Sequence, residues 1–304
     1  MSAAAESESD TMQCCASCGT AEIDDIKLKR CNGCHLVKYC SVECQKAHRS
    51  KHKKECKKRA AELKDEILFK QPESSHLGDC PICCLPLPID IKKSSMYSCC
   101  GKHMCTGCSY ANLKREREEG LQRKCPFCRT PLPKSEEEFI EQLLKRVEAN
   151  DPVAMQEMGT ERRKKGDYNS AFEYWTRAAA LGDVQAHYNL SLLYANGQGV
   201  EKDEKKQLHH LKEAAIGGHP TARNNLGCVE EDNGRLDRAA KHWIIGAKLG
   251  YGNSLDPLKT LYRAGLVSKE DFNAALRGYQ AAIDATKSPQ REEAKLNAPN
   301  RVFF

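Results

Sequence analysis

The sequence predicts a multi-domain protein in which two small cysteine-rich fingers precede an all-α helical-repeat solenoid. The first observation is the cysteines: there are 18, and all except Cys228 lie between Cys14 and Cys128. The second is their spacing, because most form pairs two or three residues apart, as tetrahedral zinc sites require. The third is that small and aromatic residues recur after Asp151 in steps of roughly 34 residues, a period typical of stacked helix pairs.

Length and composition limit the class of protein. The 304 residues are enough for two to three domains at roughly 100–200 residues each. Residues 1–13 are acidic and rich in serine and alanine, so we expect disorder there and no secretory signal. The sequence has no apolar run long enough to cross a membrane. We therefore expect an intracellular protein, cytoplasmic or nuclear, whose reduced thiols bind metal rather than form disulfides.

The formal charge of +6 counts every cysteine as neutral. A zinc ion with four thiolates carries about −2, and one with three thiolates and a histidine about −1. Three sites of the first kind and one of the second bring the net charge down by about 7, to about −1. The apparent basicity is therefore no sign of a nucleic-acid partner.

Residues 14–56 contain eight residues at metal-ligand spacing. They are Cys15, Cys18, Cys31, Cys34, Cys40, Cys44, His52 and Cys56. With Tyr39-Cys40-Ser41 in its usual place, this pattern resembles a MYND zinc finger. The resemblance implies interleaved sites, with one zinc on Cys15, Cys18, Cys40 and Cys44 and a second on Cys31, Cys34, His52 and Cys56. It also implies that the finger binds short proline-containing peptides. We call residues 14–56 the first finger.

Residues 57–79 are predicted to be a helical linker, with a short polar helix ending before Pro72. Its basic residues, together with Arg49, Lys51, Lys53 and Lys54, fit two interpretations. One is a nuclear address or a phosphate contact. The other is a solvated helix face beside a negatively charged zinc cluster.

Residues 80–133, the central finger, hold a second array of ligands. They are Cys80, Cys83, Cys99, Cys100, Cys105, Cys108, Cys125 and Cys128. The array resembles a RING finger without its usual Cys-x-His step. The resemblance implies one zinc on Cys80, Cys83, Cys105 and Cys108. The other zinc is held by Cys125 and Cys128 with two of Cys99, Cys100 and His103; the Cys99-Cys100 pair is favoured and His103 is the substitute. Cys84 has no partner at ligand spacing, and neither has Cys14, although Cys14 could replace Cys15.

The RING resemblance implies an activity, the transfer of ubiquitin from a conjugating enzyme. In that family the enzyme rests on an apolar residue of the first Cys pair, on the proline of the last pair, and on a cation after it. Ile82, Pro126 and Arg129 occupy these positions here. The alternative for Ile82 is packing against its own finger.

Residues 134–150 are predicted to form a linker and capping helix. The helix starts at a capping box at Ser135, and its apolar stripe should pack on the repeats. The stripe consists of Phe139, Leu143, Leu144 and Val147.

Residues 151–287 repeat four times, each time as two helices. The first helices carry Met158-Gly159, Leu190-Ser191, Leu226-Gly227 and Leu258-Lys259, and the second carry Trp175, Leu211, Trp243 and Tyr279. We expect Trp175 and Trp243 to fill the core beside small residues. With Asn196-Gly197-Gln198-Gly199-Val200, the pattern resembles Sel-one-like repeats, relatives of the tetratricopeptide repeat. Residues 288–304 are polar, and we expect a disordered tail.

The sixteen ligands are enough for four closed zinc sites, which indicates structural rather than catalytic metal. We find no catalytic or other cofactor-binding residues. Two hypotheses remain: a scaffold that acts as a RING-type ubiquitin ligase and recruits substrates through the first finger and the repeats, or a non-enzymatic adaptor whose modules only bind proteins. A SET-domain methyltransferase, which also combines MYND fingers with helical repeats, would need a catalytic domain that residues 57–150 do not provide.

Overall fold

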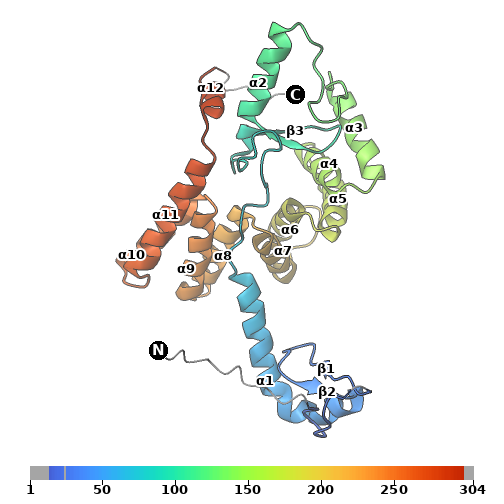
Figure 1. Ribbon diagram of the computed structural model, residues 1–304, viewed down its shortest axis with the longest axis vertical. Coiled ribbons are helices and arrows are strands. Elements are labelled where there is room, and N and C mark those ends of the chain that lie inside the picture. The colour runs from blue at the N-terminus through green and yellow to red at the C-terminus, as the bar shows by residue number, and fades with distance from the viewer. Residues whose placement is uncertain (1–13, 24, 298–304) are drawn as a thin grey trace, which may run out of the picture. The chain divides into compact units, whose positions relative to one another are not determined.

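The structure, a computed structural model, describes residues 14–23 and 25–297 (Figure 1). The disorder expected for residues 1–13 and for the end of the tail therefore lies outside the described residues. The chain forms two compact units, Met1–Lys70 and Gln71–Phe304. Within the described residues, no helix has both the length and the apolar composition needed to cross a membrane.

The first unit is a small finger followed by one long helix. Strands β1 (Lys29–Arg30) and β2 (Lys38–Tyr39) pair antiparallel. Helix α1 (Val42–Leu68) begins where the Ser41 hydroxyl accepts a hydrogen bond from the Cys44 amide, 3.2 Å away. The predicted boundary at residue 56 lies inside this helix, so the linker helix is not separate. Residues 42–68 contain no glycine or proline. The helix that carries His52 and Cys56 therefore continues past the finger to Leu68.

The second unit contains the central finger, the repeats and a C-terminal helix. Its strands are β3 (Ser94–Met96) and β4 (His103–Cys105), and its 3-10 helices are η1 (Ile91–Lys93) and η2 (Gly252–Ser254). Its helices are α2 (Thr106–Glu118), α3 (Glu136–Glu148), α4 (Pro152–Lys164), α5 (Tyr168–Ala180), α6 (Val184–Asn196), α7 (Glu204–Ile216), α8 (Pro220–Asp232), α9 (Leu236–Lys248), α10 (Leu255–Arg263), α11 (Lys269–Ala285) and α12 (Pro289–Asn297). In the central finger, β3 and β4 pair antiparallel and lead into α2.

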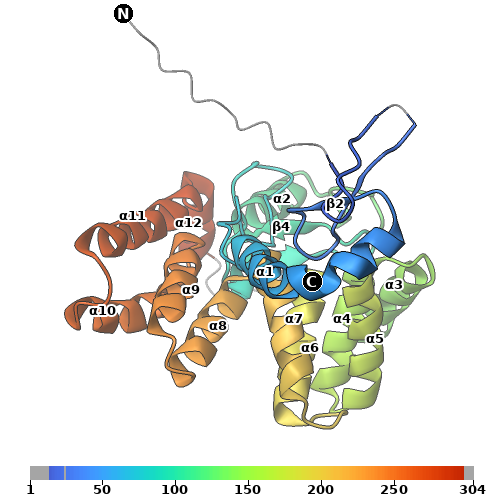
Figure 2. The same ribbon diagram turned by 90° about the horizontal axis from the view of Figure 1, so that it is seen from below.

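The repeats form four helix pairs, α4–α5, α6–α7, α8–α9 and α10–α11, which follow one another in chain order in both views (Figures 1 and 2). Trp175 and Trp243 are buried, as predicted for core residues. A Cβ atom added at Gly159 or Gly227 would overlap the ring of Trp175 or Trp243, so each glycine lets a tryptophan lie between two helices. These pairs confirm the predicted fold class.

The helices at the two ends of the array join the central finger to it. At the start of α3, the Ser135 hydroxyl accepts a hydrogen bond from the Glu138 amide, as the predicted capping box requires. Leu143 and Val147 of α3 are buried against α4 and α5, and Met96 of β3 packs on the same cluster. Leu144 is half-exposed and does not join this core. The central finger keeps its own small core around Leu87 and Met104, and Met96 connects it to the core of the repeats.

The prediction of a disordered tail from residue 288 is wrong for its described part, because residues 289–297 form α12. This helix packs on α2 of the central finger, with Ala294 and Arg291 buried. A nine-residue polar segment is a marginal helix in isolation, and tertiary packing stabilises it here. The sequence of the tail alone gives no sign of that packing.

Candidate metal centres

Four short loops of the chain share one backbone geometry. In each, the first cysteine of a C-x2-C pair accepts, through its carbonyl, a hydrogen bond from the amide four residues later. The donors and acceptors are Gly19 to Cys15, His35 to Cys31, Cys84 to Cys80 and Arg129 to Cys125. Each donor has a left-handed backbone, with φ of 74°, 59°, 55° and 65° in that order. Cys84 therefore closes a turn rather than joining a ligand group.

In the first finger, these loops and α1 bring eight ligand atoms into two groups. One group consists of Cys15, Cys18, Cys40 and Cys44, and the other of Cys31, Cys34, His52 and Cys56. Within each group all ligand atoms lie within 4.8 Å of one another. The Sγ atoms of Cys31 and Cys56 are 3.7 Å apart, and Cys34 Sγ lies 3.1 Å from Nε2 of the buried His52. One turn of α1 places His52 and Cys56 on the same face.

The central finger forms two more groups. One consists of Cys80, Cys83, Cys105 and Cys108, and the other of Cys99, Cys100, Cys125 and Cys128. The Sγ atoms of Cys83 and Cys105 are 3.8 Å apart in the first of these groups, and those of Cys99 and Cys128 are 3.3 Å apart in the second. His103 lies on β4 outside both groups, and Cys14 joins no group in the first finger. The four sets coincide with the interleaved pairing that the two resemblances imply.

The distances test whether zinc fits. Sulfurs at about 2.3 Å from a tetrahedral zinc are about 3.8 Å from each other. The sulfur–sulfur separations above run from 3.3 to 3.8 Å, at or somewhat below this value and far longer than the roughly 2.05 Å of a disulfide. All the described cysteines are free. The donor set and its geometry therefore fit four zinc ions, as predicted. Each site is closed by four protein ligands, so the bound ion supplies cross-links that replace an apolar core rather than a reaction centre.

One thiol in each group ionises easily. Burial opposes ionisation of Cys15, but hydrogen bonds from the Cys18 and Cys40 amides lower the pKa of its thiol to about 6. At the other three sites burial also raises the thiol pKa, and hydrogen-bond donors again lower it by more. The resulting pKa is about 6 for Cys31, about 7 for Cys80 and about 6 for Cys128. The donors are mainly backbone amides at Cys15, Cys31 and Cys80, and the Thr130 hydroxyl comes first at Cys128; they favour the thiolate, which is the form that binds zinc.

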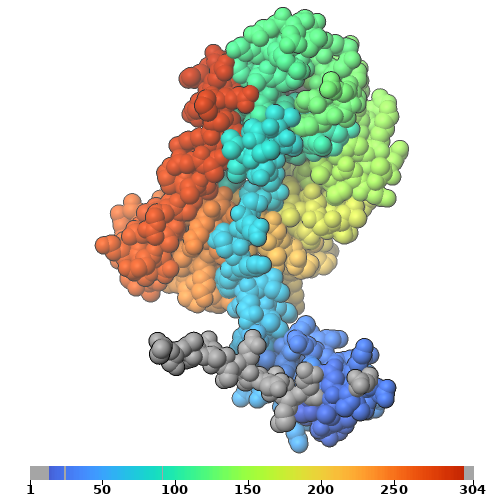
Figure 3. Space-filling view, viewed as in Figure 1, coloured from blue at the N-terminus to red at the C-terminus, as the bar shows by residue number. Residues whose placement is uncertain are grey.

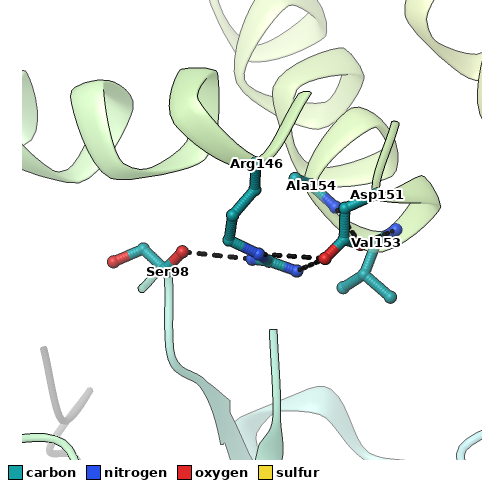
Figure 4. Close-up of polar contacts among 5 residues, drawn as sticks. All are labelled: Ser98, Arg146, Asp151, Val153 and Ala154. Atoms are coloured by element: carbon teal, nitrogen blue, oxygen red, sulfur yellow. Dashed lines mark hydrogen bonds and ion pairs between the residues drawn. The ribbon is translucent and has the colours of Figure 1, made fainter. Parts of the chain in front are cut away.

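Arg146 of α3 joins the second metal group of the central finger to the repeats (Figure 4). Its Nη1 donates to the Ser98 carbonyl at 3.1 Å, next to Cys99. Its Nε and Nη2 donate to one carboxylate oxygen of Asp151, at 3.0 and 2.6 Å. Asp151 in turn caps α4 by accepting from the amides of Val153 and Ala154. A Cβ atom at Gly101 would overlap this guanidinium.

Arg291 of α12 makes the corresponding contact with the first metal group. Its Nη2 donates to Cys83 Sγ at 3.4 Å and to the Leu85 carbonyl at 3.2 Å. Its Nη1 donates to the Pro86 carbonyl at 2.8 Å. A cation beside a zinc-bound thiolate offsets part of the site's negative charge. Sequence reasoning missed both arginines, because nothing in the local pattern marks them.

The three residues expected to contact a partner lie on the loops of the central finger. Ile82 is 52% exposed, so it does not pack into its own finger. Arg129 is exposed at the left-handed position of the last loop, and Pro126 is half-buried.

Comparison with known proteins identifies two of the modules. The family model of the MYND finger matches residues 15–56, and that of the Sel1 repeat matches residues 153–183 and 184–219. DAP3-binding cell death enhancer 1 of Mus musculus is 25% identical over 232 residues, 60% of this chain and 46% of that protein. Its Rattus norvegicus counterpart is 33% identical over 199 residues, 52% of this chain and 39% of that protein. SET domain and MYND-type zinc finger protein 6 of Schizosaccharomyces pombe is 37% identical over 59 residues, 19% of this chain and 12% of that protein. The chain thus spans less than half the length of these relatives.

Among solved structures, a Sel1 repeat protein from Oxalobacter formigenes has 23% identity and a TM-score of 0.44, and the match covers 62% of this chain and 76% of that one. The protective antigen c5321 of uropathogenic Escherichia coli, which has an SLR fold, has 19% identity and a TM-score of 0.40, covering 57% and 38%. The family models and the four ligand groups together show a MYND finger, further clusters that fit zinc, and Sel1 repeats in one chain.

Proposed function

We propose that the sixteen grouped side chains are the zinc ligands, and that the scaffold acts as an adaptor that binds proteins through the first finger and the repeats. The thiolate chemistry suits a reducing compartment, so we place the protein inside the cell. Two relatives are named for binding DAP3, which makes DAP3 the first candidate partner to test.

The exposed apolar side chains of the first finger carry this proposal. Its small core consists of Cys15, Leu28, Cys31, Cys34 and Tyr39. Because cysteines form most of that core, other large aliphatic residues of the finger stay on the surface. Ile23, Leu36 and Val42 are 59%, 61% and 57% exposed. Apolar groups that a small domain leaves in water are favourable contacts for a partner.

Leu36 lies in the loop after Cys34, so it tests the finger directly. We expect Leu36→Ser to weaken binding of proline-containing peptides to the full chain by about tenfold, the loss of one buried leucine contact. Isothermal titration measures this, with zinc content as the check on folding. Ile67→Ser is the matched control, because Ile67 is 56% exposed on the same unit but far along α1. Equal affinity for wild type and Leu36→Ser would overturn the proposal.

A second candidate function is ubiquitin transfer through the central finger. It is supported by the exposed Ile82, together with Pro126 and Arg129 at the positions that the RING resemblance implies. In that mechanism the finger holds the loaded conjugating enzyme in a reactive pose and does no covalent chemistry itself.

We expect the full chain to form ubiquitin chains with activating enzyme and at least one member of a broad conjugating-enzyme panel. Ile82→Ala should abolish this without changing the zinc content, because the side chain supports nothing inside the finger. Leu121→Ala is the matched control, since Leu121 is 47% exposed on the same finger. An inactive wild type across the whole panel would exclude this candidate and leave the adaptor function.

A further inference from the structure

The segment that enters the second unit lies against the repeats as a bound peptide would (Figures 1 and 3). The His76 amide donates to the Gly218 carbonyl at 3.2 Å. A Cβ atom at Gly218 would come within 2.8 Å of the Ser74 carbonyl oxygen and 3.5 Å of Pro72. Residues 72–76 therefore follow the surface at the α7–α8 turn, where a side chain on residue 218 would interfere.

The ring of His76 occupies a slot built by α6 and α8. It stacks on His219, with ring centroids 4.4 Å apart and planes at 15°. Tyr188 of α6 also stacks on His219, at 4.2 Å and 22°. Because both rings lie nearly parallel to His219 at about the same distance, they lie on its opposite faces. The slot is therefore shaped for a flat ring laid against His219.

Hydrogen bonds fix the charge and position of His219. Its Nδ1 accepts from the Ala222 amide at 3.2 Å, so this nitrogen carries no proton. Its Nε2 then donates to Gln185 Oε1, at 3.2 Å. His219 is thus held as a neutral imidazole, and burial keeps its pKa well below the usual range. The floor of the slot is uncharged and stays in one orientation.

His76 itself fits this slot poorly. Its ring is buried, and within the described residues neither ring nitrogen makes a hydrogen bond of standard geometry, although Gln185 and Gly218 lie close enough to raise its pKa. Burial lowers its pKa to about 4, against weaker opposing effects of Gln185 and Gly218. A buried polar nitrogen without a partner is destabilising. A phenyl or phenol ring would make the same stack without that cost.

The segment is also loosely covered on its other side. A cavity of about 860 Å³ lies between it and the C-terminal repeats, lined in part by Pro72, Ser75, Thr221, Tyr251 and Ile283. This volume is typical of ligand sites. The cavity therefore leaves residues 71–75 without close packing on that side.

We propose that the Tyr188–His219 slot is a peptide-recognition site, that residues 71–79 are its internal occupant, and that its partner is an extended peptide with an aromatic residue in place of His76. The proposal rests on the adaptor function and names the chemistry that the repeats recognise. Residues 71–79 compete with the partner, so the partner binds only when it replaces this segment in the slot.

The probe is a synthetic, fluorescently labelled peptide with the sequence of residues 71–79 and phenylalanine at the sixth position. We expect the full-length His76→Ala variant to bind it about tenfold more tightly than wild type, because the slot is vacated. The same peptide with alanine at that position should bind about tenfold more weakly than the phenylalanine peptide. Equal binding of the two peptides, or equal affinity for wild type and His76→Ala, would overturn the proposal.

Two glycines provide a matched pair for locating the site. Gly218 and Gly182 end equivalent helices with φ of +85° and +86°, but a Cβ atom at Gly182 has nothing within 4 Å. In the His76→Ala background, Gly218→Ala should abolish peptide binding and Gly182→Ala should preserve it. The same loss in both variants would place the peptide elsewhere. Peptides bound by the first finger depend on Leu36 and not on Gly218, so failure of that function remains distinguishable.

Discussion

Replacing Cys105 with serine should lower the melting temperature of the repeats as well as release the two zinc ions of the central finger. Cys105 is fully buried, belongs to the first metal group of the central finger, and accepts the Cys108 amide hydrogen bond that caps α2. Structural zinc contributes about 10–16 kcal/mol to folding, so this finger should not survive the change. Its loss removes the contacts that Arg146 of α3 and Arg291 of α12 make with the finger, and we expect the repeat transition to fall by about 10 °C.

Circular dichroism follows the repeats, because most of the helices are in the array, and mass spectrometry follows the zinc. Cys228→Ser and Cys84→Ser are the controls, since both residues are exposed and outside the four groups. If zinc falls to two ions while the helical transition keeps its wild-type temperature, the finger and the repeats are independent, contrary to the contacts of Met96, Arg146 and Arg291 described above.

Replacing Arg146 with alanine should destabilise the second unit. The guanidinium is only 11% exposed and joins the Ser98 carbonyl to Asp151, which is 31% exposed. Removing the guanidinium leaves the partly exposed Asp151 carboxylate and the Ser98 carbonyl without their donor, at a cost of about 1–3 kcal/mol. Urea unfolding measures the loss, and zinc content should stay at four because Arg146 is no ligand.

The adjacent residue gives the control. Lys145 pairs with Glu141 at 2.8 Å on the same helix, but both side chains are about two-thirds exposed, at 69% and 66%. Such pairs contribute little, so Lys145→Ala should unfold like wild type. The role assigned to Arg146 is wrong if the two variants unfold at the same urea concentration.

Local pattern accounts for most of what the sequence predicts correctly. Zinc ligands are specified by spacing over two or three residues, and a helix pair by small and large residues four apart, so both kinds of signal are readable without tertiary contacts. Trp175 illustrates this, because its period with Trp243 indicates a core position and the structure buries it.

Contacts between distant segments account for the rest. Helix α12 is polar and short, and only its packing on α2 makes it helical. Arg146 and Arg291 resemble ordinary surface cations in the sequence. Their burial depends on the central finger: Ser98 precedes Arg146 by 48 residues, and Pro86 precedes Arg291 by more than 200. The slot occupied by His76 likewise joins the linker to α6 and α8. The repeat pattern of the sequence gives no sign that His76 stacks on His219. Helix α1 is a different case. The local sequence favours a continuous helix, but the predicted domain boundary at residue 56 divided it into two parts.

The number of metal ions tests the central claim most directly. Native mass spectrometry of the full chain, purified without chelator, should give four zinc ions per molecule. The sixteen grouped ligands are enough for four closed sites. A chain that is folded in both units and carries only two zinc ions would contradict this, because one finger would then be held together by something other than metal.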